Sequence, residues 1–116
     1  MTSSAIEVRA GDDPRTAIVV LHDALDVHSA PIVRERLGAV LGQSWTTVIL
    51  DLHDVEFIDS TGLGVLIGAR RRSQDAHTKL VLARLSRATH RLLAITGMRR
   101  HFTITKAARS GTDTAA

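Results

Sequence analysis

The sequence contains no cysteine among its 116 residues. Disulfide scaffolds and thiolate metal sites are therefore excluded, and a reducing compartment, the cytosol, is the expected setting. Aromatic residues make up only 3%, so the core has to be built from Val, Ile, Leu and Ala. The chain also lacks the run of about 18 apolar residues that a transmembrane helix needs, and its first residues lack a basic n-region. Neither a membrane span nor a signal peptide is expected.

Charge of one sign is only slightly in excess. Lys and Arg outnumber Asp and Glu by 15 to 12, for a net charge of +3, and much of that excess follows Arg70. No aromatic residues are interleaved with the basic ones, and Trp45 is the only Trp or Tyr. The pattern favours a solvated basic face over a nucleic-acid surface, and no direct nucleic-acid binding is expected. A salt-dependent binding assay would decide between the two.

The spacing of apolar residues predicts strands that alternate with helices in a single domain. Apolar runs and alternating patterns predict strands at residues 5–9, 16–21, 48–52, 79–83 and 102–105. Helical periodicity predicts three helices, with Ser29 and Ser86 as candidate caps of the first and third and Gly42 and Gly97 as their ends.

This order of elements, β-β-α-β-α-β-α-β, is typical of the α/β class. Strands that alternate with helices predict a mostly parallel sheet with right-handed crossovers. The first strand is expected to be antiparallel, because residues 11–14 have the composition of a hairpin turn. The domain is predicted to span residues 5–106, and the small, polar tail at 107–116 is predicted to be disordered.

The segment from Val48 to Gln74 carries the main functional signal. A buried strand leads through a short acidic connection, residues 53–58, into Asp59-Ser60-Thr61-Gly62, which opens a helical pattern. Ser60 is predicted at the helix N-cap or one residue from it, where unpaired backbone N–H groups and the positive end of the dipole gather. From the residues alone, Ser60 is either a helix cap or a site of phosphate chemistry.

Glycines inside this second helix need a reason, because each costs up to about 1 kcal/mol relative to Ala. Gly62, Gly64 and Gly68 all fall within the helical pattern. We expect a close approach there, either of the helix to the sheet or of a partner to the helix start.

Three motifs in order resemble the STAS domain, in particular the bacterial anti-sigma factor antagonist family. The most specific is LDLHDVEFIDSTGLGVLIGA, residues 50–69. The second is Leu25-Asp26 followed by Ser29-Ala30, and the third is residues 91–98 before Phe102. The chain departs from the family pattern at Asp23-Ala24, where Gly-Glu is usual. Asp tolerates a left-handed backbone better than most residues, so the turn can form, whereas the missing Glu bears on which partner fits.

The resemblance implies a partner switch rather than an enzyme. Such proteins bind an anti-sigma factor that is also a serine kinase, and thereby free the sigma factor. The kinase then phosphorylates the motif serine, here Ser60, the antagonist dissociates, and a phosphatase resets it. The partner-binding residues implied by the resemblance are Asp26, Asp59, Ser60, Thr61, Gly62 and Leu63. No cofactor or metal is expected, and a monomer is favoured.

Phosphorylation would add about −1.5 to −2 charge beside Asp59 and Asp26. We expect this to disrupt the partner interface without refolding the domain, since a helix start tolerates a phosphate. Thr61 is interpreted as a first-turn helix residue and not as a second phosphosite.

Two rival functions remain open at this stage. An enzyme is disfavoured, because the aspartic-protease D-[ST]-G signature lacks the extra residue found here and a G-x-S-x-G elbow is absent. His22, His28 and His53 lack the spacing of metal ligands. The other rival is a STAS module that does not switch, as part of a sensory scaffold, a lipid-transport complex or an anion transporter. Copurification with such a subunit, instead of a small ATP-binding kinase, would favour it.

Overall fold

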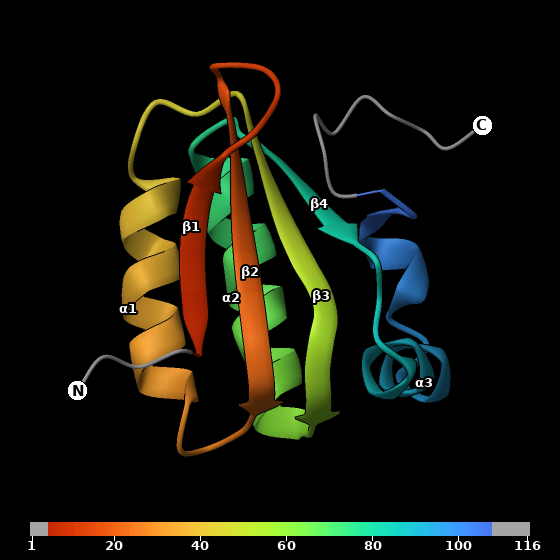
Figure 1. The fold of residues 1–116 in the computed structure, drawn as a ribbon. Helices are drawn as coiled ribbons and strands as arrows, with labels where there is room; N and C mark the ends of the chain where they lie inside the picture. The colour runs from red at the N-terminus through yellow and green to blue at the C-terminus, as the bar shows by residue number, and fades with distance from the viewer. Residues whose placement is uncertain (1–4, 108–116) are drawn as a thin grey trace.

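Residues 5–107 form a mixed sheet with crossover helices, as described by a computed structural model (Figure 1). Within these residues, the strands are β1 (Ile6–Ala10), β2 (Thr16–Leu25), β3 (Thr47–Ile58), β4 (Lys79–Ala83) and β5 (Thr103–Thr105). The helices are α1 (Ala30–Leu41), α2 (Ser60–Asp75), α3 (Arg87–Thr96) and the short 3₁₀ turn η1 (Arg99–His101). The predicted class and the predicted order of strands and α-helices are confirmed. Of the tail predicted at 107–116, residues 108–116 lie outside the described residues.

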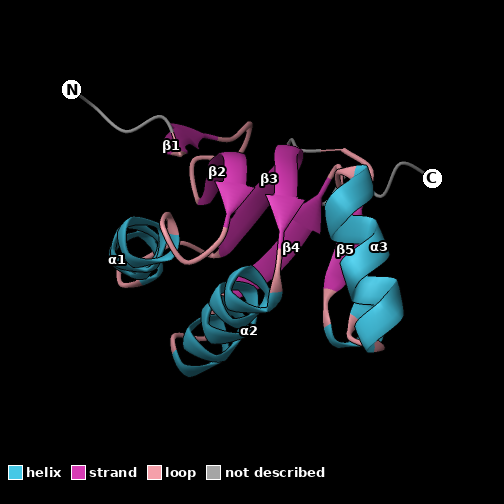
Figure 2. Cartoon of the chain, turned by 90° about the horizontal axis from the view of Figure 1, so that it is seen from below, coloured by secondary structure: helices cyan, strands magenta, loops and turns pink. Residues whose placement is uncertain are grey.

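The sheet has the order β1-β2-β3-β4-β5. β1 pairs with β2 in an antiparallel hairpin, and every later pairing is parallel. Because each crossover from β2 onward steps in the same direction, right-handed connections place α1, α2 and α3 on one face of the sheet. Figure 2 shows α1 and α2 below the strands, with α3 at the β5 edge.

The main core lies between the sheet and these helices. Leu50 and Leu52 of β3, Leu66 of α2 and Leu93 of α3 are completely buried there. Burial of one such side chain stabilises the fold by roughly 1.5–3 kcal/mol. The strands therefore carry the apolar alternation and continuous runs that the sequence pattern indicated, and α2 is held along its length by the core.

β2 and β3 run further than the apolar pattern predicts, which corrects the expected loop after Leu21 and the expected acidic connection after Leu52. β2 continues to Leu25 and β3 to Ile58. Irregularities in the pairing near Asp23 allow the strands to stay together while polar side chains turn to solvent. The extra length places both strand ends beside the start of α2.

The helix ends show one predicted cap and one that is wrong. The Ser86 hydroxyl accepts from the Thr89 N–H at 3.1 Å, and Gly97 ends α3 in a left-handed conformation with φ of 71°, both as predicted. Ser29 occupies the N-cap position of α1 but does not cap it. Its hydroxyl instead donates to the carbonyl of Ala24 at 2.7 Å, because the turn before α1 folds back onto the end of β2.

A charged pair joins β3 to the end of β4. The guanidinium of Arg84 donates to both carboxylate oxygens of Asp51, with Nη2 to Oδ2 at 3.0 Å and Nε to Oδ1 at 3.1 Å. The Asp51 side chain is buried, and Arg84 adopts a positive φ of 51°. Among the described residues, no helix is both long and apolar enough to cross a bilayer.

Candidate functional site

The carboxyl ends of β2 and β3 bring two acidic residues to the same edge of the sheet. Leu25 is paired with Ile58, the last residue of each strand. Asp26 and Asp59 follow directly, and both are partly buried. Ligands of open α/β sheets characteristically bind outside the carboxyl ends of the strands. The structure therefore brings together the two acidic residues that the sequence placed in separate motifs.

Asp59 caps α2. It has an extended backbone at the N-cap position, and its carboxylate accepts from the N–H groups of Thr61 at 3.0 Å and Gly62 at 3.1 Å. These are two of the amides that a helix start leaves without an intrahelical partner. The interpretation of Ser60 as the cap is therefore wrong.

Ser60 is the first residue of α2, one position after the cap, as predicted. Its side chain is exposed. Within residues 5–107 the hydroxyl makes no hydrogen bond, because Asp59 satisfies the first-turn amides in its place. An exposed hydroxyl that makes no hydrogen bond to the described part of the fold is chemically available for modification.

The other predicted partner-binding residues lie deeper. Thr61 is partly buried, and Gly62 and Leu63 are buried, with Leu63 in the main core. These three residues shape the site from beneath more than they cover its surface. Their burial holds the backbone of Ser60 in place.

Close approach explains one of the helix glycines. A Cβ on Gly62 would collide with the carbonyl oxygen of Leu25 and lie 2.7 Å from Cγ1 of Ile58. The same atom on Gly64 or Gly68 would meet nothing within 4 Å. The expected approach of helix to sheet is thus confirmed at Gly62 alone.

The turn at Asp26 is held by hydrogen bonds among its own residues. The Asp26 carboxylate accepts from the N–H of His28 at 2.9 Å and of Ser29 at 3.2 Å, and the Ser29 hydroxyl accepts from the Asp26 N–H. Just before it, Asp23 has φ of 63°. Asp in the left-handed conformation, where the family pattern has Gly, is confirmed.

Two large apolar side chains are exposed at this end of the sheet, and the sequence reading missed both. Val27, beside Asp26, is 63% exposed, and Phe57, two residues before Asp59, is 52% exposed. Phe57 sits opposite Ala24 in the register of β2 and β3. For Phe57 the sequence offered one signal. It stands directly before Ile58, and because neighbouring side chains of a strand point to opposite faces, both cannot face the core. Together, Val27, Phe57, Asp26, Asp59 and Ser60 form what we call the Ser60 surface.

The three histidines considered as metal ligands lie on different segments: His22 in β2, His28 in the turn before α1 and His53 in β3. His22 contacts Glu7 Oε2 at 3.4 Å and Asp54 Oδ2 at 3.5 Å on the strands. The hydrogen bond from Arg9, with a smaller one from His22, lowers the pKa of Glu7 below its usual value. The part of the chain that the structure describes contains no cluster of three or more His, Asp or Glu arranged to hold a metal ion.

Comparisons with known proteins identify the family of the chain. The STAS domain family matches residues 6–110. An anti-sigma-B factor antagonist of Listeria monocytogenes is 35% identical over 94 residues, which cover 81% of this chain and 82% of that protein.

Solved structures share the fold. The anti-sigma factor antagonist SpoIIAA in its unphosphorylated form has a TM-score of 0.72 at 20% identity, over 88% of this chain and 89% of that one. The phosphorylated form of the Bacillus cell fate determinant SpoIIAA has a TM-score of 0.67 at 20% identity, over 88% of this chain and 92% of that one. With the matched family and the Asp59-capped start of α2, these findings show that the chain belongs to the STAS domain family.

Proposed function

We propose that this chain is a cytoplasmic anti-sigma factor antagonist that phosphorylation of Ser60 switches off. The observation that carries the proposal is that the helix cap and the exposed hydroxyl at the start of α2 belong to different residues. Asp59 caps the helix, so the exposed Ser60 hydroxyl is left without a hydrogen bond in the described structure. The similarity to an anti-sigma-B factor antagonist supports an anti-sigma factor as the partner. That this partner is also the serine kinase that modifies Ser60 is part of the proposal.

The position of Asp59 explains why a phosphate on Ser60 would weaken the binding of a partner. The carboxylate already accepts from the Thr61 and Gly62 amides, so these donors are not free to neutralise a phosphate on Ser60. About −1.5 to −2 charge would therefore add to that of Asp59 at the surface. A partner packed there would meet uncompensated charge and a steric block. A loss of about 3 to 4 kcal/mol corresponds to several hundredfold weaker binding.

The Ser60 surface also has the composition that an interface needs. The exposed Val27 and Phe57 supply apolar area beside the acidic Asp26 and Asp59. Interface centres are enriched in aromatic residues, while charges gather at the rim. We infer that the partner covers Phe57 and reads the charge at Ser60, and that a phosphatase restores the unmodified state.

Release is proposed to need no refolding. Gly62 packs against the ends of β2 and β3, and Leu63 is part of the core, so the backbone of Ser60 is braced on both sides. Two-dimensional NMR spectra of the free and phosphorylated protein test this point. Shifts confined to residues around Ser60 are expected, and large shifts throughout the core would contradict it.

The first experiment is phosphosite mapping by mass spectrometry on protein from its own cells, in growth and under stress. Phosphate confined to Ser60, with an occupancy that changes with condition, is expected. Serine that stays unmodified in every condition would refute the switch and favour a constitutive STAS module.

Calorimetry with the proposed partner, the anti-sigma factor kinase, then tests the charge mechanism. Ser60→Glu should weaken the complex strongly, whereas Ser60→Ala should keep it. Ser44→Glu is the matched control, since Ser44 is exposed and lies in the turn before β3, at the opposite end of the sheet. Equal weakening by Ser44→Glu would show a general charge effect and overturn the proposal.

A further inference from the structure

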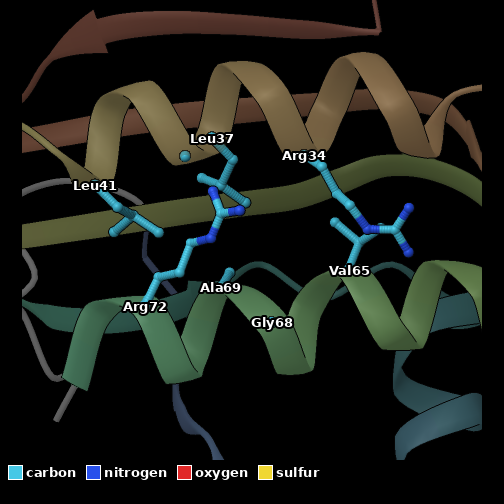
Figure 3. A pocket seen from close by; sticks show the side chains of 8 residues that line it. Arg34, Leu37, Leu41, Val65, Gly68, Ala69 and Arg72 are labelled. Atoms are coloured by element: carbon cyan, nitrogen blue, oxygen red, sulfur yellow. The ribbon is translucent and has the colours of Figure 1, made fainter. Parts of the chain in front are cut away.

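A hollow of about 130 Å³ lies between α1 and α2, away from Ser60. Figure 3 shows Arg34 reaching from α1 and Arg72 from α2 into the space between the two helices. The apolar side chains beneath them come from both helices: Leu37, Leu41, Val65 and Ala69. Two cations thus share one apolar-floored groove.

Neither guanidinium has an anionic partner in the part of the chain that the structure describes. Asp75 lines the adjoining hollow together with Arg72 but lies outside ion-pairing distance. Like charges in a cleft with apolar walls raise the local concentration of anions. The groove is therefore an electropositive site without a counter-charge from the domain itself.

Helix dipoles account for only one of the two arginines. Arg72 belongs to the last turn of α2, where a cation is favourable. Arg34 lies in the second turn of α1, where the dipole offers a cation no such benefit. In Figure 3, Arg34 extends beside Val65, and no ion pair within the described residues holds it there.

Two glycines shape the groove. The Arg72 guanidinium occupies the place that a Cβ on Gly38 would take, so Gly38 lets it lie close against α1. Gly68, on the facing side, has open space at its Cβ position. A larger side chain at Gly68 would project into solvent-accessible space at the groove without meeting the core.

We propose that this groove binds a small organic anion, a carboxylate or phosphate head group on a short apolar body. The planar guanidinium fork binds carboxylate and phosphate oxygens in pairs, and the apolar side chains suit the body of the ligand. The volume lies well below the roughly 300–1,000 Å³ of pockets for drug-sized ligands, which excludes an enclosed nucleotide. This site is separate from the Ser60 surface and does not depend on phosphorylation.

Titration of the ¹⁵N-labelled full chain with hexanoate and with hexyl phosphate tests the proposal by NMR. Saturable shifts at the Gly38 and Gly68 amides are expected with the acids. The acid with the higher affinity identifies the preferred head group. The difference in affinity between hexyl phosphate and inorganic phosphate measures the contribution of the apolar body. Hexylamine, which has the same body and the opposite charge, should produce no saturable shift. Equal binding of hexylamine, or no saturable shift with either acid up to its solubility limit, would overturn the proposal.

Variants separate the groove from the surrounding surface. The double substitution Arg34→Gln with Arg72→Gln should weaken binding about tenfold or more, whereas Arg71→Gln, an exposed neighbour outside the groove, should not. Gly68→Leu should block the groove, and Gly64→Leu, equally open but outside it, is the matched control. Unchanged affinity in both groove variants, with folding verified by the same spectra, would refute the site.

Discussion

The carbonyl oxygen of Leu25 lies where a side chain on Gly62 would begin. This contact joins the end of β2 to the first turn of α2, and Cγ1 of Ile58 in β3 lies 2.7 Å from the same Cβ position. The position of Ser60 is therefore set by backbone packing and not by a flexible loop. The variants below test this arrangement and the pieces that support it.

Gly62→Ala should destabilise the fold by about 1–3 kcal/mol, the cost of overpacking a tightly packed site. The new methyl group would meet backbone and the Ile58 side chain, neither of which can move aside cheaply. Gly64→Ala is the control, and it should stabilise by up to about 1 kcal/mol because its Cβ position is open and Ala favours a helix. Urea denaturation measures both. Equal stability of the two variants would contradict the close contact.

Asp59→Ala should lower the free energy of unfolding by about 0.5–2 kcal/mol, as expected for a lost helix cap. Ser60→Ala should change it by no more than about 0.5 kcal/mol, because the hydroxyl has no hydrogen bond in the described structure. The same denaturation assay gives both values. A larger loss for Ser60→Ala than for Asp59→Ala would assign the cap to Ser60.

Asp23→Gly should be neutral or slightly stabilising, whereas Asp23→Val should cost about 1–2 kcal/mol. The reason is the positive φ of 63°, which Gly adopts freely and a β-branched residue does not. Thermal unfolding of both variants gives the comparison. If Asp23→Val unfolds at the wild-type temperature, the left-handed turn is not present in solution.

Arg84→Ala should destabilise more than Asp51→Ala. The Asp51 side chain is 8% exposed and would remain as a buried, unpaired carboxylate, while Arg84 is 43% exposed and can return to water. Removing one partner of a buried pair costs about 3–5 kcal/mol, and the exposure of Arg84 places this case near the lower end. Arg84→Lys should fall in between, since an ammonium cannot bind both oxygens as a fork. The reverse order in denaturation would contradict the argument that the buried Asp51 carboxylate depends on Arg84.

Much of the fold follows from apolar spacing. Strands such as 79–83 and the end of α3 at Gly97 could be placed because buried runs and a left-handed glycine leave clear local signals. The true ends of β2 and β3 could not. His22 and His53 break the apolar pattern, and only the pairing of the two strands shows that the chain stays extended beyond them.

The sequence placed Asp59 and Ser60 in one candidate motif, but it could not show which of them caps the helix. Asp59 and Ser60 are both good N-caps one residue apart, and only the end of β3 at Ile58 decides between them. Arg34 and Arg72 are far apart in the sequence, so their shared groove exists only once α1 and α2 lie side by side.

The parallel order of the sheet gives the domain two unlike ends. The turn between α1 and β3, in which Gln43 and Ser44 are exposed, lies at the top in Figure 1, whereas β2 and β3 end beside the start of α2 at the bottom. Exposed tips of this kind tolerate insertions well. A fluorescent reporter inserted between Gln43 and Ser44 would therefore leave the Ser60 surface unobstructed, so the proposed complex could be followed in living cells while Ser60 stays accessible.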